Sequence, residues 1–216
     1  RSCPDCQLAQ RMQPKHHGLL QSKAVNEVNE LVSIDYIGPF PIGKDRNIMV
    51  LTIVDAFSRW PVLVPTHSTT AEVTADLVWE HWISVYGIPK RIISDQGPQF
   101  ESELFARVCE SLGIDKARTT AYHPQTNAQA ERFHRYLLPT LSALVGERSS
   151  DWVDYLSYVV FAYRCYDVAG IGLSPYQIMF GRDPRLPIDV YADEQASWQV
   201  QVDRVKYASL QSDRLR

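Results

Sequence analysis

Residues 31–57 read LVSIDYIGPFPIGKDRNIMVLTIVDAF, and this stretch decides the fold class. Its first ten residues are apolar and β-branched and end in a Gly-Pro turn signal, which predicts a strand. Its last ten, from Ile48 to Phe57, form a continuous apolar run that is typical of a central, buried strand. A third apolar segment, PVLVPT at 61–66, follows after a short gap. Because the gaps are short, we expect these three strands to form an antiparallel meander.

Beyond the meander the apolar residues take a helical spacing, and helices alternate with short strands at 91–95 and 115–120. Three strands followed by alternating helices and strands predict an α/β fold, in which a mixed five-stranded sheet is flanked by helices. The predicted helices cover 69–86, 102–113, 126–146, 151–166 and 174–180.

Helix ends and helix faces can also be predicted. Thr69 or Thr70 is a suitable N-cap for the first helix, and Ser102 is one for the second. Helical spacing places Val85 on the apolar face of the first helix and Leu144 on the apolar stripe of the helix at 126–146. We therefore expect both of these side chains to face the core.

Composition excludes several classes of protein. The chain has 216 residues, of which 45% are hydrophobic and 22% charged, enough for one well-buried domain with extensions. A net charge of -3 argues against a sequence-independent nucleic-acid coat, but a nucleic-acid enzyme stays open because a carboxylate metal site itself adds negative charge. The apolar runs are too short to cross a bilayer, so we expect no membrane partner. Four cysteines make no disulfide scaffold, which favours a reduced, intracellular compartment.

Three acids stand where functional sites form. Asp35 lies inside the first apolar strand, Asp95 ends the strand at 91–95, and Glu131 lies in the first turns of the long helix. A charge within an apolar strand is costly unless it is paired or bound to a metal. Carboxylate oxygens suit Mg²⁺ or Mn²⁺, and two such ions about 3.5–4 Å apart support in-line phosphoryl transfer.

The position of Glu131 has two interpretations. It falls nearly opposite the apolar stripe of its helix, so it is not a core residue. It could look across the sheet edge toward Asp35 and Asp95, or it could be a solvated charge that pairs with Arg135 one turn later. Periodicity does not choose between the two.

Five ordered motifs carry a resemblance to a known family: SIDYIGPFP, VDAFSRWP, GIPKRIISDQGPQF, YHPQTNAQAERFHRYL and LSPYQIMFGRDPRLPID. Together they resemble the integrases of gypsy-type long-terminal-repeat retrotransposons, which are related to retroviral integrases. The resemblance implies a ribonuclease H-like core. It also maps the D,D-35-E signature of the family onto Asp35, Asp95 and Glu131, with 35 residues between the last two.

The resemblance implies a polynucleotidyl transferase with two Mg²⁺ or Mn²⁺ ions. Such an enzyme trims the 3′ ends of the element's DNA and joins them to target DNA, so its partner is double-stranded DNA. We expect a homo-oligomer on DNA and action in the nucleus at the point of integration. The same resemblance points to Gln125, Asn127, Arg132 and Arg135 as residues that approach DNA.

Other residues receive separate expectations. Lys116 alternates with apolar residues on the strand at 115–120 and could line a phosphate track. Asp55 is expected to be structural, with Arg59 as its partner. Cys3 and Cys6 have the spacing of half a zinc site; the resemblance matches them to the last two ligands of a His-His-Cys-Cys domain, whose histidines would precede Arg1. Zn²⁺ is therefore expected only if those histidines are present, and two free cysteines are the alternative.

The expected domains follow from these assignments. Residues 1–28 form the C-terminal remnant of the zinc domain with a linker, 29–190 the catalytic core, and 191–216 a helical extension. The chain resembles a core cut from a longer polyprotein. Two alternatives stay open: a domesticated or inactive integrase-like module that binds nucleic acid or protein, and a ribonuclease or transposase on the same fold.

Overall fold

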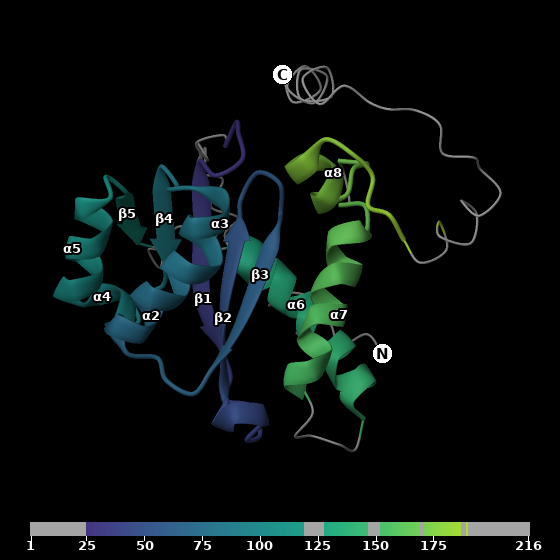
Figure 1. The fold of residues 1–216 in the computed structure, drawn as a ribbon, viewed down its shortest axis with the longest axis horizontal. Coiled ribbons are helices and arrows are strands. Elements are labelled where there is room, and N and C mark those ends of the chain that lie inside the picture. Colours follow the sequence, from purple (N-terminus) through teal and green to yellow (C-terminus); the bar gives the residue numbers. More distant parts are fainter. Residues whose placement is uncertain (1–24, 119–127, 147–151, 169–170, 187–188, 190–216) are drawn as a thin grey trace, which may run out of the picture.

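The computed structural model describes residues 25–118, 128–146, 152–168, 171–186 and 189, and in it a five-stranded mixed sheet lies between two layers of helices (Figure 1). The strand order is β3-β2-β1-β4-β5. The first three strands in the chain pair antiparallel, whereas β1, β4 and β5 pair in parallel, so the predicted meander and mixed sheet are confirmed. The strands are β1 (Leu31–Ile37), β2 (Met49–Asp55), β3 (Pro61–Thr66), β4 (Arg91–Ser94) and β5 (Asp115–Arg118).

Helices cover both faces of the sheet, with α2, η2 and α5 packed on one face and α6 and α7 on the other (Figure 1). None of the helices within the described ranges is long and apolar enough to cross a membrane. The helices are η1 (Lys44–Arg46), α2 (Ala71–Val78), η2 (Trp79–Ile83), α3 (Ser84–Tyr86), α4 (Pro98–Glu101), α5 (Glu103–Ser111), α6 (Ala128–Val145), α7 (Trp152–Cys165) and α8 (Pro175–Phe180).

The alternation of side chains along β2 divides the core into two clusters. Leu51 and Ile53 pack with α2, η2 and α5, whereas Val50 and Val54 pack with α6 and α7. Because successive side chains of a strand point to opposite faces, Thr52 points toward α6 from the middle of a row of valines. This leaves one buried hydroxyl within an otherwise apolar face.

The same alternation places Asp35 under α6. Its neighbour Ile34 belongs to the cluster on the opposite face, and Asp35 pairs in register with Thr52 of β2. A charged residue at position 35 is therefore compatible with a buried strand, because Asp35 faces one side of the sheet together with a second polar residue, Thr52.

The predicted helix caps are confirmed, but two predicted inward side chains are not. The hydroxyls of Thr70 and Ser102 each accept a backbone N–H three residues later. Val85 is 63% exposed, because the π-helical turn over Trp79–Ile83 rotates the residues that follow it away from the earlier face. Leu144 is also exposed, since it lies in the last turn of α6 beyond the end of the buried stripe.

The buried carboxylate of Asp55 has other partners than the predicted one. It accepts hydrogen bonds from the backbone N–H of Asn29 at 2.7 Å and from the N–H and hydroxyl of Ser58 at 2.6 and 2.7 Å. The link to Arg59 runs through the backbone, where the Arg59 N–H donates to the Asp55 carbonyl at 3.0 Å. The carboxylate thus stabilises the turn through these N–H and hydroxyl groups. No direct ion pair joins it to the Arg59 side chain, although its charge raises the pKa of Arg59 against the lowering by burial.

Candidate active site

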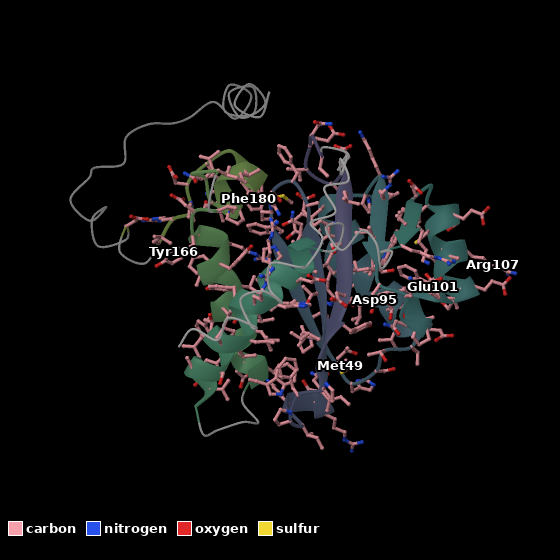
Figure 2. The ribbon with its side chains drawn as sticks, turned by 180° about the vertical axis from the view of Figure 1, so that it is seen from behind. Met49, Asp95, Glu101, Arg107, Tyr166 and Phe180 are labelled. Carbon is pink, nitrogen blue, oxygen red and sulfur yellow. The ribbon has the colours of Figure 1, made fainter. Side chains whose placement is uncertain are left out.

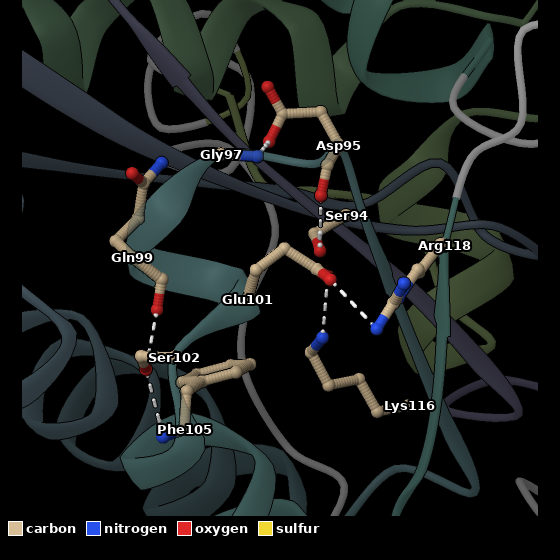
Figure 3. Close-up of polar contacts among 9 residues, drawn as sticks. All are labelled: Ser94, Asp95, Gly97, Gln99, Glu101, Ser102, Phe105, Lys116 and Arg118. Carbon is tan, nitrogen blue, oxygen red and sulfur yellow. Dashed lines mark hydrogen bonds and ion pairs between the residues drawn. The ribbon is translucent and has the colours of Figure 1, made fainter.

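The sheet brings Asp35 and Asp95 to the same level. Ser33 of β1 pairs with Ile93 of the parallel strand β4, so the residues two places further along each strand, Asp35 and Asp95, lie side by side. Asp95 follows β4 directly, and its carboxylate accepts the N–H of Gly97 at 3.0 Å (Figure 3). Seen from behind, Asp95 lies near the middle of the molecule (Figure 2).

The charges of Asp95 and Glu131 both act on the carboxyl group of Asp35. Burial raises the pKa of Asp35 to about 6, and the negative charges of Asp95 and then Glu131 add to this rise, against a lowering by the hydrogen bond from the Tyr36 N–H. Glu131 lies in the first turn of α6, and this helix packs over β1 and β2. The charge of Glu131 thus acts on Asp35, and no ion pair between Glu131 and Arg135 is found among the described side chains, which favours the first interpretation of its position.

The donor chemistry fits a hard divalent cation, although the side chains are not gathered around one point. Three carboxylates that repel one another favour a cation, and oxygen ligands suit Mg²⁺ or Mn²⁺. The side chains of Asp95 and Glu131 are exposed, whereas Asp35 is mostly buried. Within the part of the chain that the structure describes, no three His, Cys, Asp or Glu side chains lie close enough together to hold a metal ion.

His134 is a member of the site that the sequence pattern missed. Its Nε2 lies 2.9 Å from the hydroxyl of Thr52, and its Nδ1 lies 3.8 Å from Oδ2 of Asp35. Burial lowers the pKa of His134 to about 4, so the ring is neutral at pH 7. The spacing of three residues from Glu131 on one helix was the available signal. It became informative only when the partner strand was known.

We predict that His134→Phe destabilises the fold by about 1–3 kcal/mol, because it leaves the buried hydroxyl of Thr52 without a partner. Urea unfolding of the variant measures this loss. Thr52→Val in the same chain removes the orphaned hydroxyl, so the double variant should recover most of the stability. Additive losses in the double-mutant cycle would contradict the contact.

An ion-pair cluster lies beside Asp95 and involves Lys116. One carboxylate oxygen of Glu101 accepts from the Lys116 ammonium at 2.9 Å, and the other lies 2.9 Å from a guanidinium nitrogen of Arg118 (Figure 3). The Lys116 side chain is only 13% exposed. A phosphate contact from Lys116 would have to displace Glu101, so the predicted phosphate track stays a prediction.

Of the remaining predicted residues, some lie in the described part of the chain and others lie outside it. Arg132 and Arg135 are exposed on α6 on either side of the buried Phe133 and the half-buried His134. Gln125 and Asn127 lie outside the described residues, as do Cys3, Cys6 and the extension over 191–216.

Comparison with known proteins matches residues 25–124 to the family described as the integrase core domain. The chain is 29% identical over 156 residues to the retrovirus-related Pol polyprotein from transposon 412 of Drosophila melanogaster, covering 72% of this chain and 13% of that protein. It is 34% identical over 148 residues to the Gag-Pol polyprotein of avian reticuloendotheliosis virus, covering 68% and 13%. The chain thus spans about an eighth of these relatives.

Solved structures show the same fold at low sequence identity. A chain of the simian T-cell lymphotropic virus intasome, in complex with the PP2A regulatory subunit B56 gamma, superposes with a TM-score of 0.63 and 19% identity, covering 83% of this chain and 61% of that one. The HTLV-2 integrase catalytic core domain in complex with magnesium superposes with a TM-score of 0.56 and 18% identity, covering 70% and 96%. These likenesses confirm the predicted ribonuclease H-like fold class.

Proposed function

The chain belongs to the retroviral integrase superfamily, and from this premise we propose that it catalyses metal-dependent 3′-end processing and strand transfer of retroelement DNA into target DNA. The observation that carries the proposal is the raised pKa of the Asp35 carboxyl, on which burial and the charges of two further carboxylates act. Asp35 lies on β1, Asp95 directly follows the parallel neighbour β4, and Glu131 adds its charge from α6. The similarity to transposon 412 supports the gypsy-type assignment.

In this mechanism Asp35, Asp95 and Glu131 would hold two Mg²⁺ or Mn²⁺ ions. When bound, such ions supply activation of the attacking hydroxyl and neutralisation of the charge that develops on the phosphodiester. The HTLV-2 core domain was solved in complex with magnesium, which supports this choice of metal for the present chain. Cys3 and Cys6 would hold Zn²⁺ only together with two further ligands.

The neighbouring groups of the site hold the two aspartates in position and would hold the DNA. His134 lies against the Asp35 carboxyl while it holds Thr52, so it restricts the rotation of Asp35. The Gly97 N–H holds the Asp95 carboxylate at the end of β4. Arg132 and Arg135, which flank this region of α6, would position DNA phosphates without reading sequence.

The same proposal covers the DNA partner, the oligomeric state, the cellular location and the domain organisation. Double-stranded DNA, as element ends and as target, would be the partner, and a homo-oligomer would assemble on it in the nucleus. The intasome chain among the structural neighbours supports assembly on DNA. Residues 29–190 would form the catalytic core, between a zinc-domain remnant at 1–28 and a helical extension at 191–216.

A titration of the chain with Mg²⁺ and with Mn²⁺ tests this function. We expect each metal to raise the melting temperature and to support cleavage or disintegration of a branched DNA oligonucleotide. Both effects should vanish in Asp95→Asn, because the loss of one carboxylate weakens the shared site. Asp154→Asn, which changes an exposed acid on α7, is the matched control and should behave as the parent.

The outcomes separate the alternatives. Metal binding without DNA chemistry would favour a competent core that needs further parts of a longer protein. If neither metal binds, the two-metal assignment is wrong and the non-catalytic module becomes the better proposal. DNA cleavage or disintegration that persists in Asp95→Asn would also contradict the assignment of Asp95 to the catalytic site.

A further inference from the structure

Arg59 has an unusual backbone conformation for its residue type. It lies in the turn between β2 and β3 with φ of 64°, in the left-handed region that costs about 1–2 kcal/mol for most residues and almost nothing for glycine. The turn is already closed by the Asp55 carboxylate and by the bond from the Arg59 N–H to the Asp55 carbonyl. The guanidinium of Arg59 is therefore not needed to form the turn.

The guanidinium of Arg59 is partly buried and makes no ion pair with the described side chains. Its Nε is buried and makes no hydrogen bond within the described residues. The adjacent carboxylate of Asp55 is occupied by Asn29 and Ser58. Burial lowers the pKa of Arg59, and the positive charge of Arg132 lowers it further, while Tyr163 and the charge of Asp55 oppose this only in part. A charged donor left in this state is costly, which indicates a missing anionic partner.

Three elements converge around this group. The side chain of Tyr163 from α7 lies with its ring centroid 4.8 Å from that of Phe133, the residue that follows Arg132 on α6. Both Arg59 and Arg132 counteract the rise that burial causes in the pKa of Tyr163, so both positive charges lie near this one ring. The turn, α6 and α7 thus place two guanidinium groups beside a tyrosine, and no ion pair to either is found among the described side chains.

Arg164 shows what a purely structural arginine looks like in the same region. It donates from Nε and Nη2 to the carbonyl of Pro61 at 3.2 and 2.6 Å. Its guanidinium also stacks 3.9 Å above the centroid of the Trp60 ring. Arg59, in the neighbouring turn, has none of these partners for its Nε. This contrast indicates that the Arg59 guanidinium is available to bind a group from outside the chain.

We propose that Arg59 and Arg132 together bind a phosphate group, and that its source is the backbone of a DNA strand passing over the first turns of α6. Two guanidinium groups offer several N–H donors to phosphate oxygens, and Arg132 is adjacent to the proposed catalytic residue Glu131. The inference rests on the proposed function for the identity of the source. The phosphate-binding part of the proposal rests on the buried Nε of Arg59, which makes no hydrogen bond within the described residues, and on the nearby charge of Arg132.

Arg59→Gly separates a binding role from a structural one, because glycine relieves the left-handed turn while it removes the charge. We expect the melting temperature of Arg59→Gly to be no lower than that of the parent. We expect its affinity for duplex DNA to fall roughly tenfold at moderate salt, with the slope of log K against log salt smaller by about 1. Arg107→Ala removes a charge from the distant, exposed face of α5 and should change neither the affinity nor the slope.

A second experiment uses inorganic phosphate and distinguishes binding of free phosphate from binding of a DNA backbone phosphate. Phosphate should raise the melting temperature of the parent more than that of Arg59→Gly, with sodium chloride at equal ionic strength as the reference. If the parent binds DNA and Arg59→Gly binds it with unchanged affinity and slope, the proposal is overturned. If the parent binds no DNA, the proposed function fails. Differential protection by phosphate then still supports an anion site, and its absence overturns the site.

Discussion

We expect Glu131→Gln to abolish the proposed DNA joining, by roughly 10³-fold or more, and to leave the fold intact. The expected loss corresponds to about 4 kcal/mol of transition-state stabilisation, as for other charged groups that act at the reacting centre. Glu131 is exposed and lies opposite the buried stripe of α6 formed by Ala130, Phe133 and Leu137, so the isosteric amide removes only charge. Joining of a labelled element-end oligonucleotide to target DNA measures the first effect, and urea unfolding measures the second.

Glu103→Gln provides the matched control for this experiment. Glu103 is also an exposed glutamate in the first turn of a helix, but it lies on α5, on the other face of the sheet, where it pairs with Arg107. We expect joining by this variant to equal that of the parent. Joining retained by Glu131→Gln would remove Glu131 from the site and leave only the two aspartates.

We expect Asp35→Asn to make the protein more stable at neutral pH, even though it should eliminate the proposed DNA joining. In the folded chain burial and the charges of Asp95 and Glu131 raise the pKa of Asp35 from 3.8 to about 6. The folded state therefore binds the Asp35 proton more tightly than the unfolded state. Its stability is highest below about pH 4 and falls as the pH rises to about 6, above which the whole cost is present.

The size of the gain follows from the shift. A pKa displaced from 3.8 to about 6 corresponds to at most about 3 kcal/mol, and asparagine removes this cost while its side-chain oxygen still accepts the Tyr36 N–H. We therefore expect Asp35→Asn to raise the free energy of unfolding by about 1–3 kcal/mol at about pH 7.5 and by almost nothing near pH 4.

Urea unfolding of parent and variant across this pH range measures the difference. Asp76→Asn, which changes an exposed acid on α2, should leave the stability unaltered at every pH. A variant that is less stable than the parent at neutral pH would mean that contacts in the folded state favour the ionised form of Asp35, which contradicts the mutual repulsion of the three acids. The opposite changes in stability and activity are the signature of a site that stores electrostatic strain.

Much of the fold was predictable because its signals are local. Thr70 and Ser102 cap their helices through bonds that reach only three residues along the chain, and Gly87 ends a helix with a φ of 89°. The prediction for Val85 failed because one π-helical turn changed the angle between earlier and later side chains. A constant angle per residue cannot anticipate such a turn.

The site was predictable only in part. The residue types and order of Asp35, Asp95 and Glu131 carried the resemblance, but which way Glu131 faces was open. The sequence did not predict His134 as part of the site, because its partner Thr52 lies 82 residues earlier in the chain. A single polar residue within an apolar strand carries no signal of its own. The partners of Asp55 escaped for a similar reason, since Asn29 lies 26 residues away.

The sequence by itself determined the alternation of helices and strands, the helix caps and the three acids, because these depend on neighbours within one turn or one strand. Only the tertiary structure decided that the charges of Asp95 and Glu131 act on Asp35, and that the charge of Arg132 acts on the partly buried Arg59. Register between strands and burial of charge depend on segments far apart in the chain. No local periodicity encodes the electrostatic environment that results when those segments pack together.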